Sequence, residues 1–488
     1  MQLTKIQKLA VKDQQEKINQ CIKDIQGTGV AVLSGGAGYG KTYCTRKIVE
    51  GVASPGDEIL ITTLSHKALN VASSFMEASP LEFKAYTNAA STHAQKRTDP
   101  DGTEYYEPKE KYHFKNGKKI IIPPPISKAK YIIWDECSQA SKENIDLVKS
   151  LMRPDAKILF VGDIAQLPPV GYSSLSPVFT DYEVRELKYP FRYEGENAEV
   201  ANFLRNEILK GINGEKFDPY CWKQLIGLSY TDFRMFNGND PEHRKIYNEL
   251  MIKYFKEDEI MTKYIAYHNW NFKKVASYIR NFLHNSRYDW ENGDRIMAKS
   301  NYYDEKGFMK LQNSQEGTIT GKRKLKLACI WVKEYGEERF MTLHPQRYTS
   351  KSQLQGYYAQ LFRMKKDNII IEEVDYWSHD IDDKKFIPTK PIKRNWVDDT
   401  VKKIFKNGVH SKSPCDHKGK AKEMVVDFFC DIQYAYGLTS HTAQGSTYKY
   451  VFSSFKDIYS NKYISPLEML QSAYVSATRA SELNNVLY

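Results

Sequence analysis

The sequence lacks long apolar runs, and its cysteines show no pairing pattern. No stretch approaches the roughly 20 apolar residues of a membrane helix, and the segment from Met1 to Lys5 has none of the apolar core of a secretion signal. The seven cysteines form no CxxC pair, and their odd number fits free thiols in a reducing compartment. These absences argue against a membrane-spanning or disulfide-stapled protein. They predict a cytoplasmic one with no membrane partner.

The composition describes an ordinary globular chain with an excess of basic residues. Its 488 residues suffice for two or three domains, and 41% of them are hydrophobic. A net charge of +11 suits a polyanionic partner, because lysine and arginine displace counterions from phosphates. Many basic proteins bind no nucleic acid, so the charge supports such a partner without identifying it.

Four short, continuous apolar runs predict strands that are buried on both faces. Segments with helical patterns lie between them, among them Lys41–Glu50 and Ser65–Met76. This alternation predicts a parallel sheet covered by helices. The four runs are Val30–Leu33, Glu58–Thr62, Tyr131–Trp134 and Ile158–Val161.

Between His93 and Lys130 the alternation stops, and a β-hairpin is expected instead. Asn116-Gly117 stands between the β-prone runs Tyr112–Phe114 and Ile120–Ile122, which is a strong hairpin signal. We therefore expect one hairpin to be inserted in the first domain.

A second α/β region is expected to begin near Tyr182, and a different kind of domain interrupts it. The region's expected elements are the strands Val184–Leu187 and Tyr264–Tyr267 and a helix over Phe272–His284. From Gly293 to Lys422 the chain is rich in aromatic residues and lysine, which predicts a largely β insertion followed by basic, helical material. Its short β-like pieces are Arg295–Ala298, Gly317–Thr320 and Leu327–Val332, and the α/β pattern is expected to return at Met424–Phe429.

The segment from Gly35 to Thr42 matches GxxxxGK[ST] in full, after a predicted strand and before a predicted helix. Its glycines let backbone N–H groups face the phosphates, and the helix N-terminus adds positive potential. Lys41 is expected to reach the β- and γ-phosphates of ATP, and Thr42 to bind Mg²⁺. The nucleotide-binding candidates of the loop are Gly35, Gly36, Ala37, Gly38, Tyr39, Gly40, Lys41 and Thr42.

Two further segments complete the pattern of an ATPase. The run Tyr131–Trp134 delivers Asp135, expected to bind Mg²⁺, and Glu136, expected to polarise the attacking water. The sequence GDIAQLPPV at 162–170 places Gln166 near the expected γ-phosphate, and its two prolines stiffen the exit from the site.

These three segments together resemble superfamily 1B DNA helicases, which include RecD-like enzymes and, closest in size and layout, the Dda-type bacteriophage helicases. Further matching segments lie across nearly the whole chain, in the order in which the family's motifs occur. The resemblance implies that Gln7 contacts adenine, that Arg192 reaches ATP from a second domain, and that Arg479 is an arginine finger. It also implies DNA contacts by Ser65, His66, Thr92, His93, His441 and Thr442, and nucleotide contacts by Gln444 and Gly445.

The resemblance implies two RecA-like domains with parallel sheets and with ATP bound between them. The first is expected over 1–93 and 126–182, with a pin hairpin inserted over 94–125, and the second over 183–292 and 423–488. An SH3-like, β-rich domain with a basic helical extension is expected over 293–422. Tyr105, Tyr106, His113 and Phe114 are candidates for strand separation at the pin, or else they simply pack the hairpin.

The activity implied is ATP-driven, 5′ to 3′ movement of a monomer on single-stranded DNA, with separation of duplex or forked DNA. ATP and Mg²⁺ are the expected cofactors, and replication or single-strand-binding proteins are possible partners. A phage origin would place the protein in the host cytoplasm. Three alternatives stay open: a translocase that strips proteins from DNA, an RNA substrate, and a P-loop kinase or ATPase that binds no nucleic acid.

Overall fold

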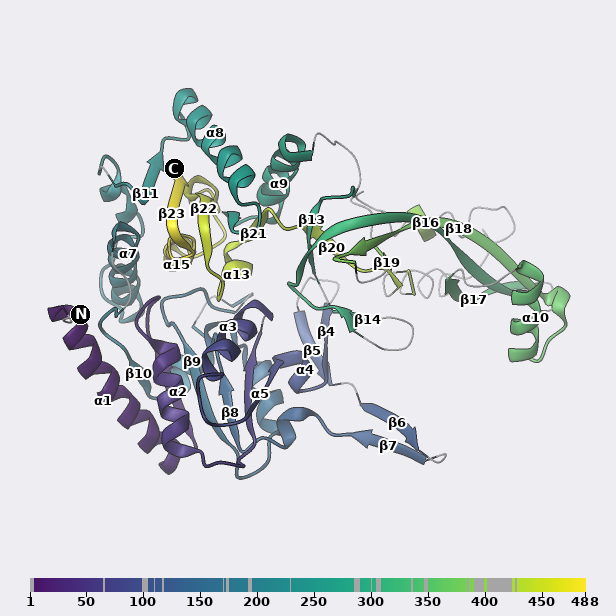
Figure 1. Ribbon diagram of the computed structural model, residues 1–488, viewed down its shortest axis with the longest axis horizontal. Coiled ribbons are helices and arrows are strands. Elements are labelled where there is room, and N and C mark those ends of the chain that lie inside the picture. The colour runs from purple at the N-terminus through teal and green to yellow at the C-terminus, as the bar shows by residue number, and fades with distance from the viewer. Residues whose placement is uncertain are drawn as a thin grey trace. The chain divides into compact units, whose positions relative to one another are not determined.

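The computed structural model divides into two compact units, Met1–Ala276 with Gly437–Tyr488, and Ser277–Tyr436 (Figure 1). Among the described residues, no helix is long and apolar enough to cross a membrane. The structure describes residues 4–64, 66–98, 104–108, 110–115, 118–169, 171–172, 175–191, 195–228, 230–284, 290–299, 301–303, 309–334, 337–345, 350–383, 386–389, 399–401, 424–425 and 428–488.

The larger unit contains two parallel sheets, and the first of them, with its helices, is called the first lobe. Its six strands are hydrogen-bonded in the order β10-β1-β9-β8-β2-β3, and every pairing is parallel. All four predicted strands are present, which confirms the expected sheet. The strands are β1 (Val30–Ser34), β2 (Ile59–Thr63), β3 (Phe83–Thr87), β8 (Tyr131–Trp134), β9 (Lys157–Gly162) and β10 (Val184–Glu186).

The edge strand β10 was expected in the second α/β region, and that placement is wrong. Val184 pairs in register with Val32 of β1, so β10 extends the first sheet. The strand is only three residues long and partly exposed, and nothing in such a short apolar run specifies which sheet it joins.

Side chains alternate between two cores on either face of the first sheet. In β8, Tyr131 and Ile133 pack in one core while Ile132 and Trp134 pack in the other. Burial on both faces explains why the strand has a continuous apolar sequence. The helices of the lobe are α1 (Lys5–Gly27), α2 (Lys41–Val52), α3 (His66–Met76), α4 (Asn88–Ser91), α5 (Lys142–Leu151) and α6 (Pro177–Asp181), with 3₁₀ turns η1 (Pro125–Ser127) and η2 (Cys137–Gln139).

The second lobe is built on a five-stranded sheet of order β11-β23-β22-β12-β21, again parallel at every pairing. This confirms the expected α/β class with two parallel sheets. The strands are β11 (Phe233–Phe236), β12 (Thr262–Ala266), β21 (Gly437–Thr439), β22 (Tyr448–Ser454) and β23 (Ala480–Leu487). The helices are α7 (Glu196–Ile212), α8 (Pro241–Glu257), α9 (Asn269–His284), α13 (Ser440–Ala443), α14 (Phe455–Tyr459) and α15 (Pro466–Ala477), with the 3₁₀ turn η3 (Cys221–Leu225).

The smaller unit is largely an antiparallel sheet, as predicted for the insertion. The pieces Gly317–Thr320 and Leu327–Val332, expected as separate strands, are parts of one strand, β16 (Glu316–Glu334). β16 pairs with β13 (Arg295–Ala298), β17 (Glu337–Pro345) and β18 (Ile369–Ile381). The other elements are β14 (Tyr302–Tyr303), β15 (Met309–Leu311), α10 (Lys351–Leu361), η4 (Lys366–Asn368), β19 (Phe386–Pro388) and β20 (Ile432–Tyr434).

The expected return of the α/β pattern at Met424–Phe429 is wrong. The described residues Met424, Val425 and Phe428 are helical. The next strand, β20, pairs antiparallel with β13 of the smaller unit. The parallel sheet resumes only at β21, where Gly437 pairs with Tyr264 of β12.

Two hairpins occupy the segment in which one was expected. β6 (Lys111–Lys115) pairs with β7 (Lys118–Ile122) around Asn116-Gly117, which confirms the hairpin drawn from that dipeptide; the dipeptide itself lies outside the described residues. A second hairpin joins β4 (Ala94–Thr98) to β5 (Glu104–Pro108). The strand-separation candidates are therefore divided, with Tyr105 and Tyr106 in β5 and His113 and Phe114 in β6.

Candidate nucleotide site

The phosphate loop connects β1 to α2 and depends on glycine at two of its positions. A Cβ atom on Gly36 would lie 2.7 Å from the ring of Tyr39, and one on Gly40 would lie 2.4 Å from Nε2 of Gln14. Gly40 also has a φ of 86°, in the left-handed region that favours glycine. Gly38 (φ 77°) completes the turn. A side chain at Gly36 would have to displace the ring of Tyr39, and one at Gly40 the amide of Gln14.

Lys41 is the first residue of α2, and its ammonium group lies inside the loop. Nζ donates hydrogen bonds to the carbonyl oxygens of Gly35 at 2.8 Å and Gly36 at 3.2 Å. Thr42 follows in the first turn of α2. These carbonyls hold the lysine at the place where the loop's N–H groups and the helix N-terminus converge, which is the arrangement suited to a phosphate chain.

Asp135 and Glu136 follow the buried strand β8. The backbone N–H of Glu136 donates to Oδ1 of Asp135 at 2.9 Å, and Glu136 adopts a positive φ of 55°. Burial and then the neighbouring charge of Glu136 raise the pKa of Asp135. Oε2 of Glu136 is buried with no hydrogen-bond partner among the described residues. Two crowded carboxylates, one with an unsatisfied oxygen, fit a hard cation and a water molecule.

Gln166 is buried, and groups from the second lobe surround it. Nε2 of Gln444 donates to Oε1 of Gln166 at 3.2 Å, and Nε2 of Gln471 donates to the backbone carbonyl oxygen of Gln166 at 2.9 Å. Gln444 also contacts Gln139. The contact between the two amides brings together Gln166, the predicted γ-phosphate residue, and Gln444, a predicted nucleotide residue of the segment Thr439–Ser446, which resembles the fifth motif of the helicases and is called the fifth motif.

Gly445 packs against Ala68 and Glu136. A Cβ atom at this position would lie 2.9 Å from Cβ of Ala68 and 3.3 Å from Cγ of Glu136. Gly445 has a φ of 71°. Only glycine lets the second lobe approach Glu136 so closely.

Substitution of Gly445 by alanine is therefore expected to reduce ATP turnover more than it reduces stability. The added methyl group would lie 2.9 Å from Cβ of Ala68 and 3.3 Å from Cγ of Glu136, so the backbone at Gly445 must move away from Ala68 and Glu136 must yield slightly. Misplacement of a catalytic group by up to 1 Å costs up to about a hundredfold in rate. Gly56→Ala is the matched control, because Gly56 also has a positive φ of 92° but has no atom within 4 Å of an added Cβ.

Both alanines carry the left-handed backbone strain of roughly 1–2 kcal/mol. A thermal melt should show destabilisation of both variants, larger for Gly445→Ala because of its contact with Ala68, whereas kcat should fall only for Gly445→Ala. Equal kcat in the two variants would show that the contact with Glu136 has no role in turnover.

Arg479 is buried at the end of α15 and hydrogen-bonds to neutral oxygens. It donates to the carbonyl of Val475 at 3.1 Å, to Oγ1 of Thr478 at 2.8 Å and to the carbonyl of Ser446 at 3.2 Å. No carboxylate forms an ion pair with it within the described part of the chain. A buried guanidinium without an anion is costly, so this one is suited to receive an anionic group. The other predicted arginine, Arg192, lies outside the described residues.

Arg205 is a functional candidate that sequence reasoning missed. Its guanidinium, from α7 of the second lobe, donates to Asp163 at 3.4 Å and to Glu186 at 2.9 Å, and lies 5.2 Å from the ring centre of Tyr39. The hydroxyl of Tyr474 donates to the same Asp163 at 2.7 Å. Arg205 thus joins the second lobe to both the phosphate loop and the GDIAQLPPV segment at 162–170, called the Gly-Asp segment.

One signal in the sequence points to Arg205. It shares the apolar stripe of α7 with Ala201, Leu204 and Ile208, all of them buried. A charged residue on the buried stripe of an amphipathic helix needs a buried partner. The identity of that partner, Asp163, follows only from the fold.

The predicted DNA-contact residues lie in two places. Thr92 is buried and donates from Oγ1 to the carbonyl of Asn88 at 2.8 Å, and His93, beside it, has a φ of 55°. His441 and Thr442 lie in α13 of the second lobe. Burial lowers the pKa of His441 to about 4, so its ring is neutral near pH 7. Ser65 lies outside the described residues, and the backbone of His66 opens α3.

Gln7 caps the first helix. Its Oε1 accepts from the N–H of Thr4 at 3.0 Å, and Oγ1 of Thr4 accepts from the N–H of Gln7 at 3.2 Å. This reciprocal capping box fixes the start of α1. The predicted adenine contact stays a prediction.

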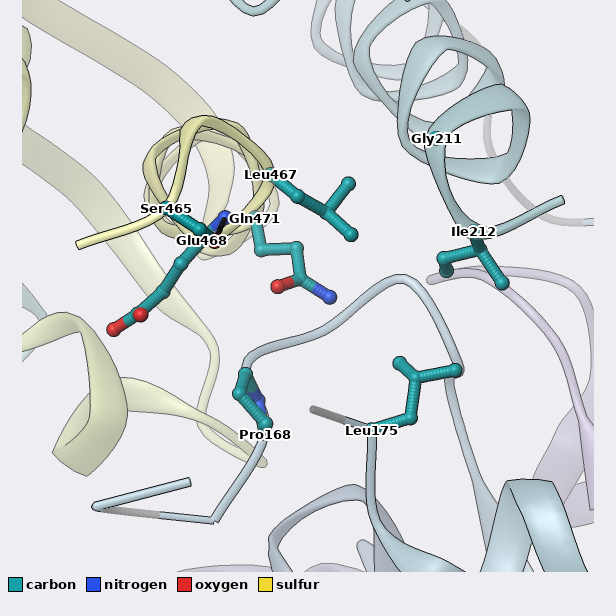
Figure 2. Close-up of a pocket in the computed structure, with 8 residues that line it drawn as sticks. All are labelled: Pro168, Leu175, Gly211, Ile212, Ser465, Leu467, Glu468 and Gln471. Carbon is teal, nitrogen blue, oxygen red and sulfur yellow. Dashed lines mark hydrogen bonds between the residues drawn. The ribbon is translucent and has the colours of Figure 1, made fainter. Parts of the chain in front are cut away.

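A small cavity of about 190 Å³ lies beside the Leu-Pro-Pro segment rather than at the phosphate loop. Figure 2 shows Gln471 and Leu467 of α15 facing the loop that carries Pro168, with Leu175 opposite. Ordinary ligand pockets span roughly 300–1,000 Å³, so this cavity is small for one. The cavity lies where α15 packs against the Leu-Pro-Pro end of the Gly-Asp segment.

Comparison with known proteins gives one family match. Residues 16–172, about a third of the chain, match a protein-family model described as an AAA domain. The uncharacterized protein R530 of Acanthamoeba polyphaga mimivirus is 25% identical over 489 residues, covering 92% of this chain and 93% of that protein. This relative is a mimivirus protein, so it gives no support to the predicted bacteriophage source or Dda-type likeness, which stay predictions.

Among solved structures, two coordinating Pif1 helicases at forked double-stranded DNA align with a TM-score of 0.46 and 14% identity, covering 99% of this chain and 92% of that chain. Pif1 helicase from Bacteroides with ADP-AlF3 and single-stranded DNA aligns at 0.45 and 14%, covering 97% and 91%. Pif1 helicase from Candida albicans aligns at 0.41 and 12%, covering 100% and 94%. Alignments at this level of similarity assign no role to individual residues of this chain. The roles of the site residues are argued from the contacts within this chain.

The family match coincides with that geometry. It begins within α1, contains the phosphate loop and the Asp135–Glu136 pair, and ends just beyond the Gly-Asp segment. It supports nucleotide binding by the first lobe and agrees with the predicted resemblance to superfamily 1B. Residues 16–172 of this chain are thus similar to an AAA domain.

Proposed function

We propose that this chain is an ATP-driven helicase that moves 5′ to 3′ along single-stranded DNA and separates duplex strands. One observation carries the proposal: the site has two halves, one from each lobe. Gly445 packs on Glu136, and Gln444 pairs with Gln166, so the fifth motif of the second lobe completes the acidic site of the first. A nucleotide-binding enzyme with one fixed lobe has no need of this arrangement.

The first lobe supplies the groups that hold ATP. Lys41 would exchange its two carbonyl partners for β- and γ-phosphate oxygens, and Thr42 and Asp135 would hold Mg²⁺. The ion, when bound, neutralises phosphate charge. Glu136 would accept a proton from the attacking water, for which its unsatisfied oxygen is available.

The second lobe supplies the groups that respond to ATP. Arg479 and Arg192 would neutralise charge on the γ-phosphate, and Gln166 would report its presence through Gln444. Because these contacts span two lobes, ATP favours one arrangement of the lobes and hydrolysis releases it. Alternation between two arrangements, with a grip on DNA in each lobe, advances the enzyme by a step.

The DNA is proposed to cross both lobes, with Ser65, His66, Thr92 and His93 on the first, and His441 and Thr442 on the second. His441 is neutral, so it would act through shape and hydrogen bonding rather than charge. The hairpins that carry Tyr105, Tyr106, His113 and Phe114 would separate the strands, with a monomer as the active unit. The SH3-like character of the insertion and replication partners belong to the same proposal. So do the domain boundaries given above, except that β10 extends the first domain and β20 belongs to the insertion.

The deciding experiment compares unwinding of duplexes that carry a 5′ or a 3′ single-stranded tail. We expect ATP-dependent opening of the 5′-tailed duplex only, together with ATP hydrolysis that single-stranded DNA stimulates. A strand-displacement assay with a labelled short strand measures the first, and phosphate release measures the second.

Each contrary result selects another candidate. Opening of only the 3′-tailed duplex reverses the direction of movement. DNA-stimulated hydrolysis without opening of either duplex favours a translocase that strips bound proteins. Hydrolysis at full rate without nucleic acid favours a P-loop ATPase or kinase. Stronger stimulation by RNA than by DNA would show that the protein moves along RNA.

A further inference from the structure

An exposed tryptophan lies directly beyond a buried strand of the second lobe. β12 ends at Ala266, and the chain continues through Tyr267 and His268 into α9, where Trp270 is 63% exposed. Trp270 therefore lies just beyond the carboxyl end of a parallel strand. In open α/β sheets this end of the strands is where ligands bind.

The segment before Trp270 is held rigidly by one buried carboxylate. Oδ2 of Asp457 accepts from the N–H of Tyr267 at 2.7 Å and from that of His268 at 3.0 Å, and Nδ1 of His268 lies 3.0 Å from Oδ1. The side chain of Asp457 is 2% exposed. The hydroxyl of Tyr267 donates to Glu468 at 2.7 Å. The aromatic groups are thus oriented before any ligand arrives.

The rings form a series that leads from the fifth motif to the surface. The Tyr267 ring lies 6.1 Å from that of His441, the His268 ring lies 5.3 Å from that of Tyr267, and the Trp270 ring lies 5.8 Å from that of His268 at an interplanar angle of 33°. The series starts beside Thr442, a predicted DNA contact, and ends on a flat, accessible indole.

The charge around Trp270 favours an anionic, planar ligand. Lys273 and Lys274 are both exposed within the next turn, and the first turn of α9 contains no acidic residue. The two nearby carboxyl groups are engaged: Asp457 is buried beneath the segment, and Glu468 accepts from Tyr267, while burial raises its pKa. A nucleobase joined to a phosphate backbone combines the two properties that this surface suits.

We propose that Trp270, on the frame made by Tyr267, His268 and Asp457, stacks on an unpaired base of single-stranded DNA. The inference rests on the proposed function and deepens it, because it assigns a contact with a base to one residue of the proposed DNA track. Stacking tolerates any base, since each has a planar face. Trp270 would therefore hold one base in the second lobe during movement, without sequence preference.

A comparison of an intact oligonucleotide with a matched abasic one tests this assignment. Equilibrium binding to an oligothymidine and to the same length of abasic deoxyribose-phosphate is measured by fluorescence anisotropy for the wild type, Trp270→Ala and Trp270→Phe. We expect Trp270→Ala to lose about tenfold in affinity for the intact strand and less than twofold for the abasic strand. Trp270→Phe, which keeps a planar ring, should retain most of the affinity.

Tyr463→Ala is the matched control, because Tyr463 is a 98% exposed aromatic residue of the same lobe with no ring partner among the described residues. It should bind both strands as the wild type does. Equal losses on intact and abasic strands in Trp270→Ala would overturn stacking and leave the proposed function intact, as would unchanged binding. A wild type that binds neither strand, and whose ATP hydrolysis DNA does not stimulate, would overturn both.

Discussion

Replacement of Glu136 by glutamine is expected to lower kcat for ATP hydrolysis by about 10²–10⁴-fold while nucleotide binding changes little. Glutamine keeps the size of the side chain, so the close packing of Gly445 against it should survive. What is lost is the ability to take a proton from water. The buried Oε2 without a partner is the atom positioned for that task.

Two measurements separate the loss of chemistry from the loss of binding. Titration with a fluorescent ATP analogue should give a Kd for Glu136→Gln close to that of the wild type, and phosphate release should show the fall in kcat. Lys41→Ala is the contrasting variant, because it removes the ammonium group held by Gly35 and Gly36 and should weaken binding or turnover. Normal hydrolysis by Glu136→Gln would mean that another group is the base.

Local patterns predicted the first lobe well because its chemistry is local. The continuous apolar strands, the glycines of the phosphate loop and the acids after β8 each depend on near neighbours in the chain. The Asn116-Gly117 dipeptide likewise identified its hairpin, since a turn of that kind is specified within a few residues.

The features that were missed depend on partners far along the chain. β10 is too short to specify its sheet, and it is placed by pairing with β1. The strand β16 was divided in two because its middle, with Lys322, Arg323 and Lys324, is polar; pairing with β18 extends it through this stretch. Hydrogen bonding between strands, rather than hydrophobic periodicity, determines its length.

The candidate site shows the same division. The residues of the first lobe could be identified from spacing alone, whereas the pairing of Gln166 with Gln444 and the approach of Gly445 to Glu136 join residues about 300 positions apart. Arg205 carried a sequence signal, a charge on an apolar stripe, but its partners Asp163 and Glu186 come from the first lobe. No local pattern contains that information.

Replacement of Arg479 by alanine is expected to produce the largest kinetic loss in the chain, about 10³–10⁵-fold in kcat if it acts as an arginine finger. Its guanidinium is buried, and its hydrogen bonds go to Thr478 and to the carbonyls of Val475 and Ser446. Neutral acceptors orient the group without cancelling its charge. The charge is then available to a developing anion on the γ-phosphate.

Arg479→Lys isolates geometry from charge, because lysine keeps the positive charge and loses the planar fork of donors. We expect it to fall between the wild type and Arg479→Ala in kcat, with a similar KM for ATP. Arg234→Ala is the matched control, since Arg234 of the same lobe also donates to a backbone carbonyl, that of Thr231 at 3.1 Å, but lies in β11 outside the proposed site. It should hydrolyse ATP at the wild-type rate.

Steady-state hydrolysis at saturating ATP and single-stranded DNA measures these differences, and a thermal melt of each variant separates them from unfolding. Loss of the bond from Arg479 to Ser446 weakens the link between α15 and the fifth motif, so some destabilisation of Arg479→Ala is expected. The proposal requires that kcat fall far more than this accounts for. If Arg479→Ala is folded and its kcat lies within threefold of that of the wild type, Arg479 does not supply the counter-charge to the γ-phosphate. The two lobes would then be coupled through their remaining contacts, among them those of Arg205, Gln444 and Gln471.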